Sequence, residues 1–378
     1  MRVSQSIWTE EKGWQSEPAE GEASRAQVVF IFGARRLLAR ANLLAEIRAR
    51  SPMAMLMGCS TAGEICGPHV FDDSVVATAV EFERTNVRSA WVSITADSSQ
   101  AAGRALGEQL AAPNLSHVFL LSEGLNVNGS ALVAGLREGL PPGVQMTGGL
   151  SADGAAFQST GVLIGGELRG GVVCGIGFYG SALRAGYGSM GGWDPFGPHR
   201  VITRSDGNIL YELDGQSALA LYKKYLGDYA KDLPSSGLLF PLLVRRTERE
   251  PGFVRTILSV DEASHSLRFA GDVPQGAIAQ LMRANFDRLI DGASGAATVT
   301  QLAQGRHAAQ LALLISCVGR KLVLQQRIEE EVEAVRDILG DAATMAGFYS
   351  YGEISPLTPG ARCDLHNQTM TITTLSEA

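Results

Sequence analysis

Short apolar runs and segments of helical spacing alternate along the first half of the chain. Helices are predicted where apolar residues recur every three or four positions, over 35–50, 98–111 and 129–140. Strands are predicted where runs of about five to eight largely apolar residues end at glycine, proline or polar residues, over 28–33, 53–57, 74–82, 87–94 and 117–121. Glycine-punctuated antiparallel strands follow over 158–181.

The second half begins after a Gly- and Pro-rich stretch, 186–207, which we interpret as a connection. The pattern then predicts helices over 211–227, 276–290 and 322–339, and strands over 238–244, 253–260, 311–316, 345–354 and 366–375. We therefore expect an N-terminal segment over 1–25, a first domain over 26–207 and a second over 208–378.

Two stretches resemble each other across these halves. The run Ser60-Thr61-Ala62-Gly63-Glu64-Ile65 is similar to Ser350-Tyr351-Gly352-Glu353-Ile354. The stretch 117–124, followed by a helix and Gly148-Gly149, is likewise similar to 311–319, followed by a helix and Gly347. One interpretation is an α+β fold of layered β-sheets covered by helices, with two related α/β halves that form a ligand pocket. The other is coincidence, since Gly-Glu pairs are common where strands end.

The amino-acid composition argues against several classes of protein. Hydrophobic residues make up 45% of the 378 residues and charged residues 19%, which excludes a disordered chain. The net charge of −7 and the lack of a basic cluster argue against nucleic acid as a partner. No apolar run reaches the ~18 residues of a membrane span, and residues 1–25 lack the apolar core of a secretory signal. Five cysteines without a CxxC pair fit reduced thiols, so we expect a cytoplasmic protein.

Three places carry candidate chemistry. Cys59 and Ser60 lie at a predicted strand end, where a nucleophile is displayed in some enzymes, although a small buried residue in a tight turn is the simpler interpretation. Arg320 begins a helix, against the helix dipole, so it either reaches an anion or pairs with a carboxylate such as Glu353. His366 opens the last strand beside Asn367 and is a candidate haem ligand.

The motifs together resemble the FIST family of sensory proteins. The first half resembles the FIST N domain through Gly58-Cys59-Ser60-Thr61-Ala62-Gly63-Glu64-Ile65 and Gly148-Gly149-Leu150-Ser151-Ala152-Asp153. The second half resembles the FIST C domain through Tyr211-Glu212-Leu213-Asp214-Gly215-Gln216, Ser316-Cys317-Val318-Gly319-Arg320, Gly347-Phe348-Tyr349-Ser350-Tyr351-Gly352-Glu353-Ile354 and His366-Asn367-Gln368-Thr369.

The resemblance implies a ligand-binding signalling protein and not an enzyme. One bacterial branch of the family binds haem, responds to nitric oxide and regulates a sensor histidine kinase. By that analogy we expect non-covalent haem b with His366 as the iron ligand, a histidine kinase as partner, and a homodimer. The alternative is a sensor of a small metabolite such as an amino acid. The expected ligand pocket comprises Cys59, Ser60, Glu64, Gly148, Gly149, Ser151, Arg320, Tyr351, Glu353 and Asn367.

Overall fold

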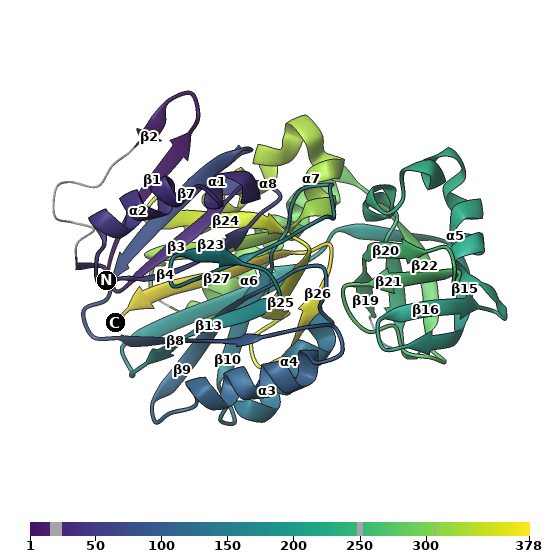
Figure 1. The fold of residues 1–378 in the computed structure, drawn as a ribbon, viewed down its shortest axis with the longest axis horizontal. Coiled ribbons are helices and arrows are strands. Elements are labelled where there is room, and N and C mark those ends of the chain that lie inside the picture. Colours follow the sequence, from purple (N-terminus) through teal and green to yellow (C-terminus); the bar gives the residue numbers. More distant parts are fainter. Residues whose placement is uncertain (16–24, 248–251, 306) are drawn as a thin grey trace.

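The protein has a large body of three β-sheets and a smaller unit that projects from it (Figure 1). The computed structural model describes residues 1–15, 25–247, 252–305 and 307–378. The smaller unit spans residues 193–284 and is inserted between strand β14 (Leu183–Met190) and helix α6 (Phe286–Gln304). The chain thus leaves the body and returns to it. The predicted class, α+β with layered sheets covered by helices, is confirmed.

The three sheets of the body have the following strands. The first, in the order β12-β11-β4-β3-β7-β1-β2, contains β1 (Arg2–Thr9), β2 (Gly13–Gln15), β3 (Val28–Gly33), β4 (Met55–Ser60), β7 (Ser74–Glu81), β11 (Val162–Ile164) and β12 (Glu167–Arg169). The second, in the order β26-β25-β10-β9-β13-β8, contains β8 (Asn86–Ser93), β9 (Leu115–Ser122), β10 (Gln145–Leu150), β13 (Val172–Tyr179), β25 (Gly352–Pro356) and β26 (Cys363–His366). The third, in the order β14-β27-β23-β24-β5-β6, contains β14, β5 (Glu64–Cys66), β6 (His69–Phe71), β23 (Leu311–Cys317), β24 (Thr344–Ser350) and β27 (Met370–Glu377).

All three sheets share one internal arrangement. Two parallel strands joined through a helix lie at the centre: β3 and β4, β9 and β10, and β23 and β24. An antiparallel strand follows on one side, β7, β13 or β27, and then an outer antiparallel strand, β1, β8 or β14. The two similar stretches found in the sequence therefore belong to a unit that occurs three times.

The three units exchange hairpins in a ring. After its second parallel strand each unit extends a β-hairpin that pairs with the sheet of another unit. Strand β5 pairs with β24, β25 pairs with β10, and β11 pairs with β4. The backbone closes the same ring with three hydrogen bonds, from Ala62 N to Tyr349 O, from Tyr351 N to Leu150 O and from Ala152 N to Ser60 O.

Three glycines mark the equivalent position of each unit. Gly58, Gly148 and Gly347 each lie opposite a residue of the parallel neighbour strand. A Cβ atom at any of them would approach the carbonyl oxygen of that neighbour to 1.9 Å. The second parallel strand of each unit therefore needs glycine there, because no side chain fits between the two backbones.

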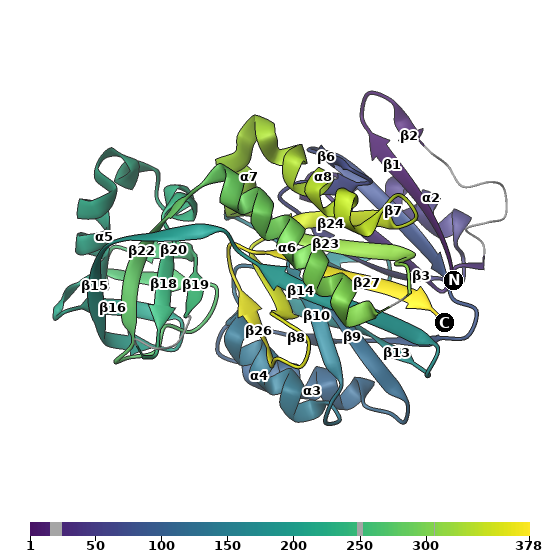
Figure 2. The same cartoon turned by 180° about the vertical axis from the view of Figure 1, so that it is seen from behind.

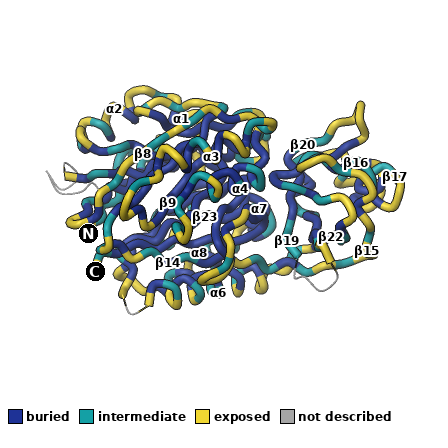
Figure 3. The backbone as a smooth tube through the Cα atoms, turned by 90° about the horizontal axis from the view of Figure 1, so that it is seen from below, coloured by how far each residue is buried: buried dark blue, intermediate teal, exposed yellow. Residues whose placement is uncertain are grey.

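The core of the body lies where the inner faces of the sheets meet. Phe30 of β3 contacts Phe119 of β9 edge to face, with ring centroids 5.5 Å apart, and Phe32 contacts Phe348 of β24 at 4.7 Å. The outer faces are covered by helices (Figure 2), which are α1 (Arg35–Leu38), α2 (Ala41–Arg50), α3 (Ser99–Leu110), α4 (Gly129–Gly139), α6, α7 (Val318–Leu324), the 3₁₀ turn η4 (Gln325–Arg327) and α8 (Ile328–Leu339). The residues of central strands such as β9 and β23 are buried, whereas the outer side of α6 is exposed (Figure 3). Over the described ranges, no helix combines the length and apolar character that crossing a bilayer requires.

The inserted unit has a sheet and a core of its own. Its strands are β15 (Trp193–Asp206), β16 (Ile209–Leu213), β17 (Gln216–Ser217), β18 (Leu242–Arg245), β19 (Phe253–Arg255), β20 (Ile257–Asp261), β21 (Ser266–Phe269) and β22 (Ile278–Ala284). Helix α5 (Ala218–Leu226) and the 3₁₀ turns η2 (Gly227–Asp232) and η3 (Ser235–Leu239) pack on this sheet. The domain boundary expected at 207/208 falls in the turn between the paired strands β15 and β16.

Several sequence-based elements differ from the structure. The helix predicted over 276–290 is wrong in its first part, because β22 pairs there with β15 and β18, and α6 begins only after the capping residue Asn285. The connection predicted over 186–207 is instead most of β14 and β15. In the N-terminal segment, β1 pairs along its whole length with β7; residues 16–24 lie outside the described part of the chain.

Candidate functional site

A cavity of about 450 Å³ lies between the inserted unit and the body. The inserted unit contributes residues of β19 and its flanks, and the body contributes residues of α4, β26 and the turn after β26. The lining residues are Ser130, Ala134, Arg137, Gly191, Arg246, Gly252, Phe253, Val254, Arg255, Asp272, Leu357, Arg362, Asp364, Leu365, His366, Asn367 and Thr369. Two of the residues expected to bind ligand, His366 and Asn367, therefore lie at one site.

His366 ends β26 and is buried at the cavity wall, with 7% of its surface exposed. Its Nε2 lies 2.8 Å from the carbonyl oxygen of Ser355, so this nitrogen donates a hydrogen bond and carries the proton. Burial lowers the pKa of His366 to about 4, so the ring is neutral near pH 7. Nδ1 then has a lone pair and, within the described part of the chain, no hydrogen-bond partner.

Arg255 is the charged group buried most deeply in the cavity wall, with 5% of its surface exposed. Its guanidinium donates hydrogen bonds to the carbonyl oxygens of Asp272 (2.9 Å), Val254 (3.1 Å) and Leu365 (3.3 Å) and to Ser130 Oγ (3.1 Å). All these acceptors are neutral. Burial lowers the pKa of Arg255 to about 10, which still leaves the side chain charged near pH 7.

Further charges surround Arg255 at the cavity. Arg137, Arg246 and Arg362 line it together with Asp272 and Asp364. Arg137 Nη1 is buried and has no hydrogen-bond partner among the described residues. Among the described lining residues, four arginines against two aspartates give two positive charges more than negative ones.

Asn367 and Gln368 connect the body to the inserted unit beside the cavity. Asn367 Oδ1 accepts a hydrogen bond from Thr256 N (3.3 Å), and its Nδ2 donates to Tyr351 O (3.1 Å). Gln368 Nε2 donates to Leu238 O (2.9 Å) and to Thr256 Oγ1 (3.2 Å). The turn that follows His366 thus links the body to the inserted unit through hydrogen bonds.

The predicted pocket residues of the Gly-rich motifs lie elsewhere, where the three units meet. Cys59, Ser60 and Ser151 are buried there, and Gly148 and Gly149 lie in the central strand β10. Ser60 Oγ donates to Ala152 O and accepts from Gly161 N, so it is engaged in holding the backbone. None of these five residues lines the cavity, and we assign them a structural role.

The sequence offered Glu353 as a possible partner of Arg320, but the two side chains do not pair in the structure. Arg320 is fully buried and forms an ion pair with Glu331 of α8, with Nη2 and Nε at 2.7 and 2.9 Å from Oε2. Its remaining donors reach Leu289 O and Gly191 O. The strand predicted over 345–354 divides into β24 and β25 of two different sheets, and Tyr351 lies between them.

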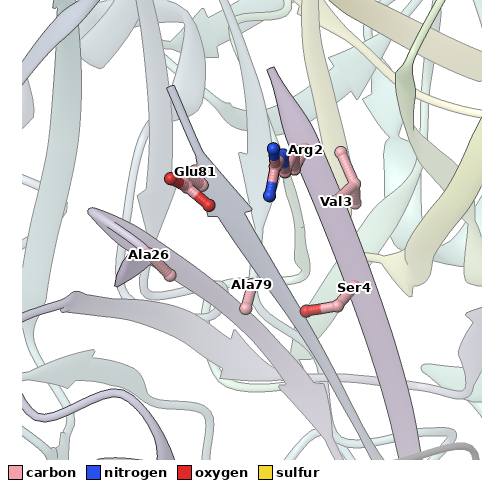
Figure 4. Close-up of a pocket in the computed structure, with 6 residues that line it drawn as sticks. All are labelled: Arg2, Val3, Ser4, Ala26, Ala79 and Glu81. Atoms are coloured by element: carbon pink, nitrogen blue, oxygen red, sulfur yellow. The ribbon is translucent and has the colours of Figure 1, made fainter. Parts of the chain in front are cut away.

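Glu64 and Glu353 are buried carboxyl groups of the hairpins β5–β6 and β25–β26. Glu64 also lines a smaller hollow of about 350 Å³ with Asp72, Asp73 and Asp153. Yet within the described ranges no group of three or more His, Cys, Asp or Glu side chains is arranged to hold a metal ion. A third hollow, of about 330 Å³, lies over the paired strands β1 and β7 beside Ala26 (Figure 4), where Arg2 is exposed and Glu81 half-buried.

The cysteines lack the surroundings of reactive thiols. Burial raises the pKa of the Cys59 and Cys317 thiols well above their usual range, and that of Cys66 to about 11. Cys363 is buried too, and its Sγ donates a hydrogen bond to Met146 O at 3.3 Å.

Sequence reasoning missed Arg255, Arg137 and Arg362. Arg255 lies in a three-residue strand, and its partners Ser130 and Leu365 are 125 and 110 residues away in the chain. Only the density of arginines near the ends of apolar strands could have drawn attention to them.

Comparisons with known proteins give a family match and several distant similarities. An uncharacterised protein found in two strains of Mycobacterium tuberculosis is 23% identical over 329 residues, which cover 84% of this chain and 82% of that protein. Crystal structures of a chorismatase (11% identity, TM-score 0.35, 99% of this chain and 98% of that one) and of a cyanuric acid hydrolase from A. caulinodans (7%, 0.38, 100% and 99%) are distantly similar. Residues 27–216 match the FIST N domain, and residues 218–356 match the FIST C domain. The chain therefore belongs to the FIST family, with a FIST N domain followed by a FIST C domain.

Proposed function

We propose that this protein is a sensor that binds a small ligand in the cavity between the inserted unit and the body. Its FIST domains support a sensory role that depends on small-ligand binding. The observation that carries the proposal is the cavity itself, about 450 Å³ with walls from both parts of the chain. Pockets of roughly 300–1,000 Å³ at domain interfaces are typical of small-molecule sites.

The position of the cavity provides a way to transmit a signal. A ligand that contacts Arg255 on one side and His366 on the other stabilises the arrangement in which both surround it. Binding then shifts the population of orientations of the inserted unit by as much as the ligand prefers the closed one. A partner protein that contacts both parts would detect this shift.

We propose binding and not catalysis as the role of the site. A thiol enzyme would need a cysteine with a lowered pKa and a neighbouring base. Cys59 and Cys317 are fully buried, burial raises the pKa of both thiols, and neither lines the cavity.

A blocking variant tests the proposal. Ala134 of α4 lines the cavity, so we expect Ala134→Phe to fill part of it. Ala101, exposed on α3, gives the matched control Ala101→Phe. A metabolite library is screened by thermal shift, and ligands that raise Tm of the parent protein should lose this effect in the first variant and keep it in the control. A ligand that protects Ala134→Phe fully would show that binding occurs elsewhere.

Haem with nitric oxide as signal, and a histidine kinase as partner, is the alternative. The residues at the cavity do not fit haem well. His366 uses Nε2 for Ser355, so an iron would be left with Nδ1, the nitrogen crowded by Cβ. Six of the described lining residues are also charged, whereas a haem site is expected to be mostly apolar. A Soret band of haem-loaded protein that moves with nitric oxide and is lost in His366→Ala would favour haem over our proposal.

A further inference from the structure

Among the residues that the structure describes, the buried charge of Arg255 has no anionic partner of its own. Its four hydrogen-bond acceptors are three carbonyl oxygens and one hydroxyl group. In the described part of the chain no carboxylate lies within ion-pair distance of it, and the influence of Asp272 and Asp364 is exerted from farther away. The ring of Phe253, whose centroid lies 4.2 Å from the guanidinium carbon, compensates part of this charge. An anion in the cavity would compensate the rest of the cost of burying it.

The geometry leaves this charge open toward the cavity. A guanidinium has five N–H donors, and four hydrogen bonds are present, which leaves one N–H on Nη2. Arg137 adds a second unsatisfied group, because its buried Nη1 has no partner among the described residues. Arg246 and Arg362 line the same cavity and are more exposed.

From this arrangement we infer that the sensed ligand is a small organic dianion, a dicarboxylate or a phosphate monoester, held by Arg255 with Arg137 and Arg362. The inference rests on the proposed function and specifies its ligand. Guanidinium groups match carboxylate and phosphate oxygens in pairs of hydrogen bonds. Among the described lining residues, the excess of two positive charges favours a ligand with two negative charges.

The arginines also come from both parts of the protein. Arg255 and Arg246 belong to the inserted unit, and Arg137 and Arg362 belong to the body. In the free protein these like charges repel one another across the cavity. A dianion between them removes this repulsion, so it favours approach of the two parts in a way that a neutral ligand of equal size does not.

The test uses defined probes on the full chain. Succinate, malate and glycerol 3-phosphate represent the two kinds of dianion, and succinamide and acetate are the neutral and monoanionic controls. We expect at least one dianion to raise Tm and to bind in calorimetry, with an affinity that falls as salt is raised. Binding of succinate or malate would identify a dicarboxylate, and binding of glycerol 3-phosphate would identify a phosphate monoester.

Three substitutions then test whether the dianion binds at the cavity arginines. Arg362→Gln, at an exposed position, should weaken dianion binding about tenfold or more without affecting folding. Arg255→Gln should weaken it further, and because Arg255 is buried, circular dichroism and the Tm of the free protein show whether this variant folds. Arg283→Gln removes an equal charge from β22 outside the cavity and should bind like the parent protein.

Two results would overturn the inference. Equal weakening in Arg362→Gln and Arg283→Gln would mean general charge attraction and not a site. Protection by a neutral or cationic library ligand, lost in Ala134→Phe, together with no binding of any dianion, would refute the anion but leave the cavity as the sensing site. If Ala134→Phe leaves every binding event unchanged, the proposed function itself fails.

Discussion

Glu64 and Glu353 occupy equivalent positions in two of the three units and are held by the same set of donors. The hydroxyl groups of Thr61 and Ser350, each three residues earlier, donate to one carboxyl oxygen. The other oxygen accepts from the backbone N–H and the hydroxyl of Ser74 or Thr369, at 3.1 and 2.7 Å for Glu64 and 3.2 and 3.1 Å for Glu353.

Replacing Glu353 by Gln should change how stability depends on pH. Burial raises the pKa of Glu353 to about 8 and that of Glu64 to about 7, against 4.5 for the ordinary group. From pH 4.5 upward the unfolded carboxyl groups lose their protons while the folded ones keep theirs, so the free energy of unfolding falls with rising pH. The slope is about 1.4 kcal/mol per pH unit for each group.

The contribution of Glu353 is the difference between the pH dependence of unfolding in the parent protein and in the variant. In urea unfolding from pH 5 to 8, Glu353→Gln should lose about half of the slope due to this pair below pH 7 and all of it between pH 7 and 8. Glu333→Gln, at an exposed position of α8, is the control and should follow the parent protein. Parallel curves for Glu353→Gln and the parent would mean that Glu353 is ionised when buried.

Substitution of Gly347 by Ala should destabilise the body strongly. The added Cβ would meet Leu314 O at 1.9 Å, so the parallel strands β23 and β24 would have to separate. We expect a loss of about 1–3 kcal/mol or more in the free energy of unfolding. Gly170→Ala is the matched control, because its Cβ would meet only Thr160 O at 3.6 Å, and it should be nearly neutral. Similar urea midpoints for the two variants would contradict the close approach.

Removal of Arg320 should leave Glu331 as an uncompensated buried charge. Arg320→Met is therefore expected to cost about 3–5 kcal/mol in urea unfolding, and Arg320→Met combined with Glu331→Gln should cost less. The exposed pair Arg327–Glu330 provides the comparison, since Arg327→Met should change stability by less than about 1 kcal/mol. A double variant as unstable as the single one would exclude charge as the cause.

Asn367→Ala should loosen the inserted unit. The change removes the acceptor of Thr256 N and the donor to Tyr351 O. Hydrogen exchange of the Thr256 amide should become about tenfold faster, since an unsatisfied buried group costs roughly 1–3 kcal/mol. Asn42→Ala, an exposed change on α2, should leave that amide unaffected. Unchanged exchange in Asn367→Ala would show that Gln368 alone holds the contact.

The sequence predicted the fold class and part of the site for a physical reason. Periodicity reports the local environment of each strand and helix, and it located β3, β9 and β23 well. It failed at 276–290, where helix-forming residues such as Ala279 and Leu281 are held in a strand by β15 and β18. It also missed the third unit, because Val162 stands where the other units have Glu64 and Glu353, after a longer loop.

The same limit of sequence-based prediction applies to the cavity. His366 and Asn367 were singled out because the pattern predicts a strand that begins at His366, although His366 in fact ends β26 and the last strand begins at Met370. Arg255 could not be singled out, since its importance comes from Ser130 and Leu365, which only the folded chain brings to it.

The exchange of hairpins has a consequence for biosynthesis. Strand β5 leaves the ribosome early, but its partner β24 is made close to the C-terminal end, since Ile65 pairs with Gly347. The body therefore cannot close before residues 344–350 have been made, and the apolar face of the early sheets has to be shielded until then. A nascent chain that terminates before residue 344 lacks the segment that receives this hairpin, so the cell would meet it as an unfinished product for chaperones and proteases.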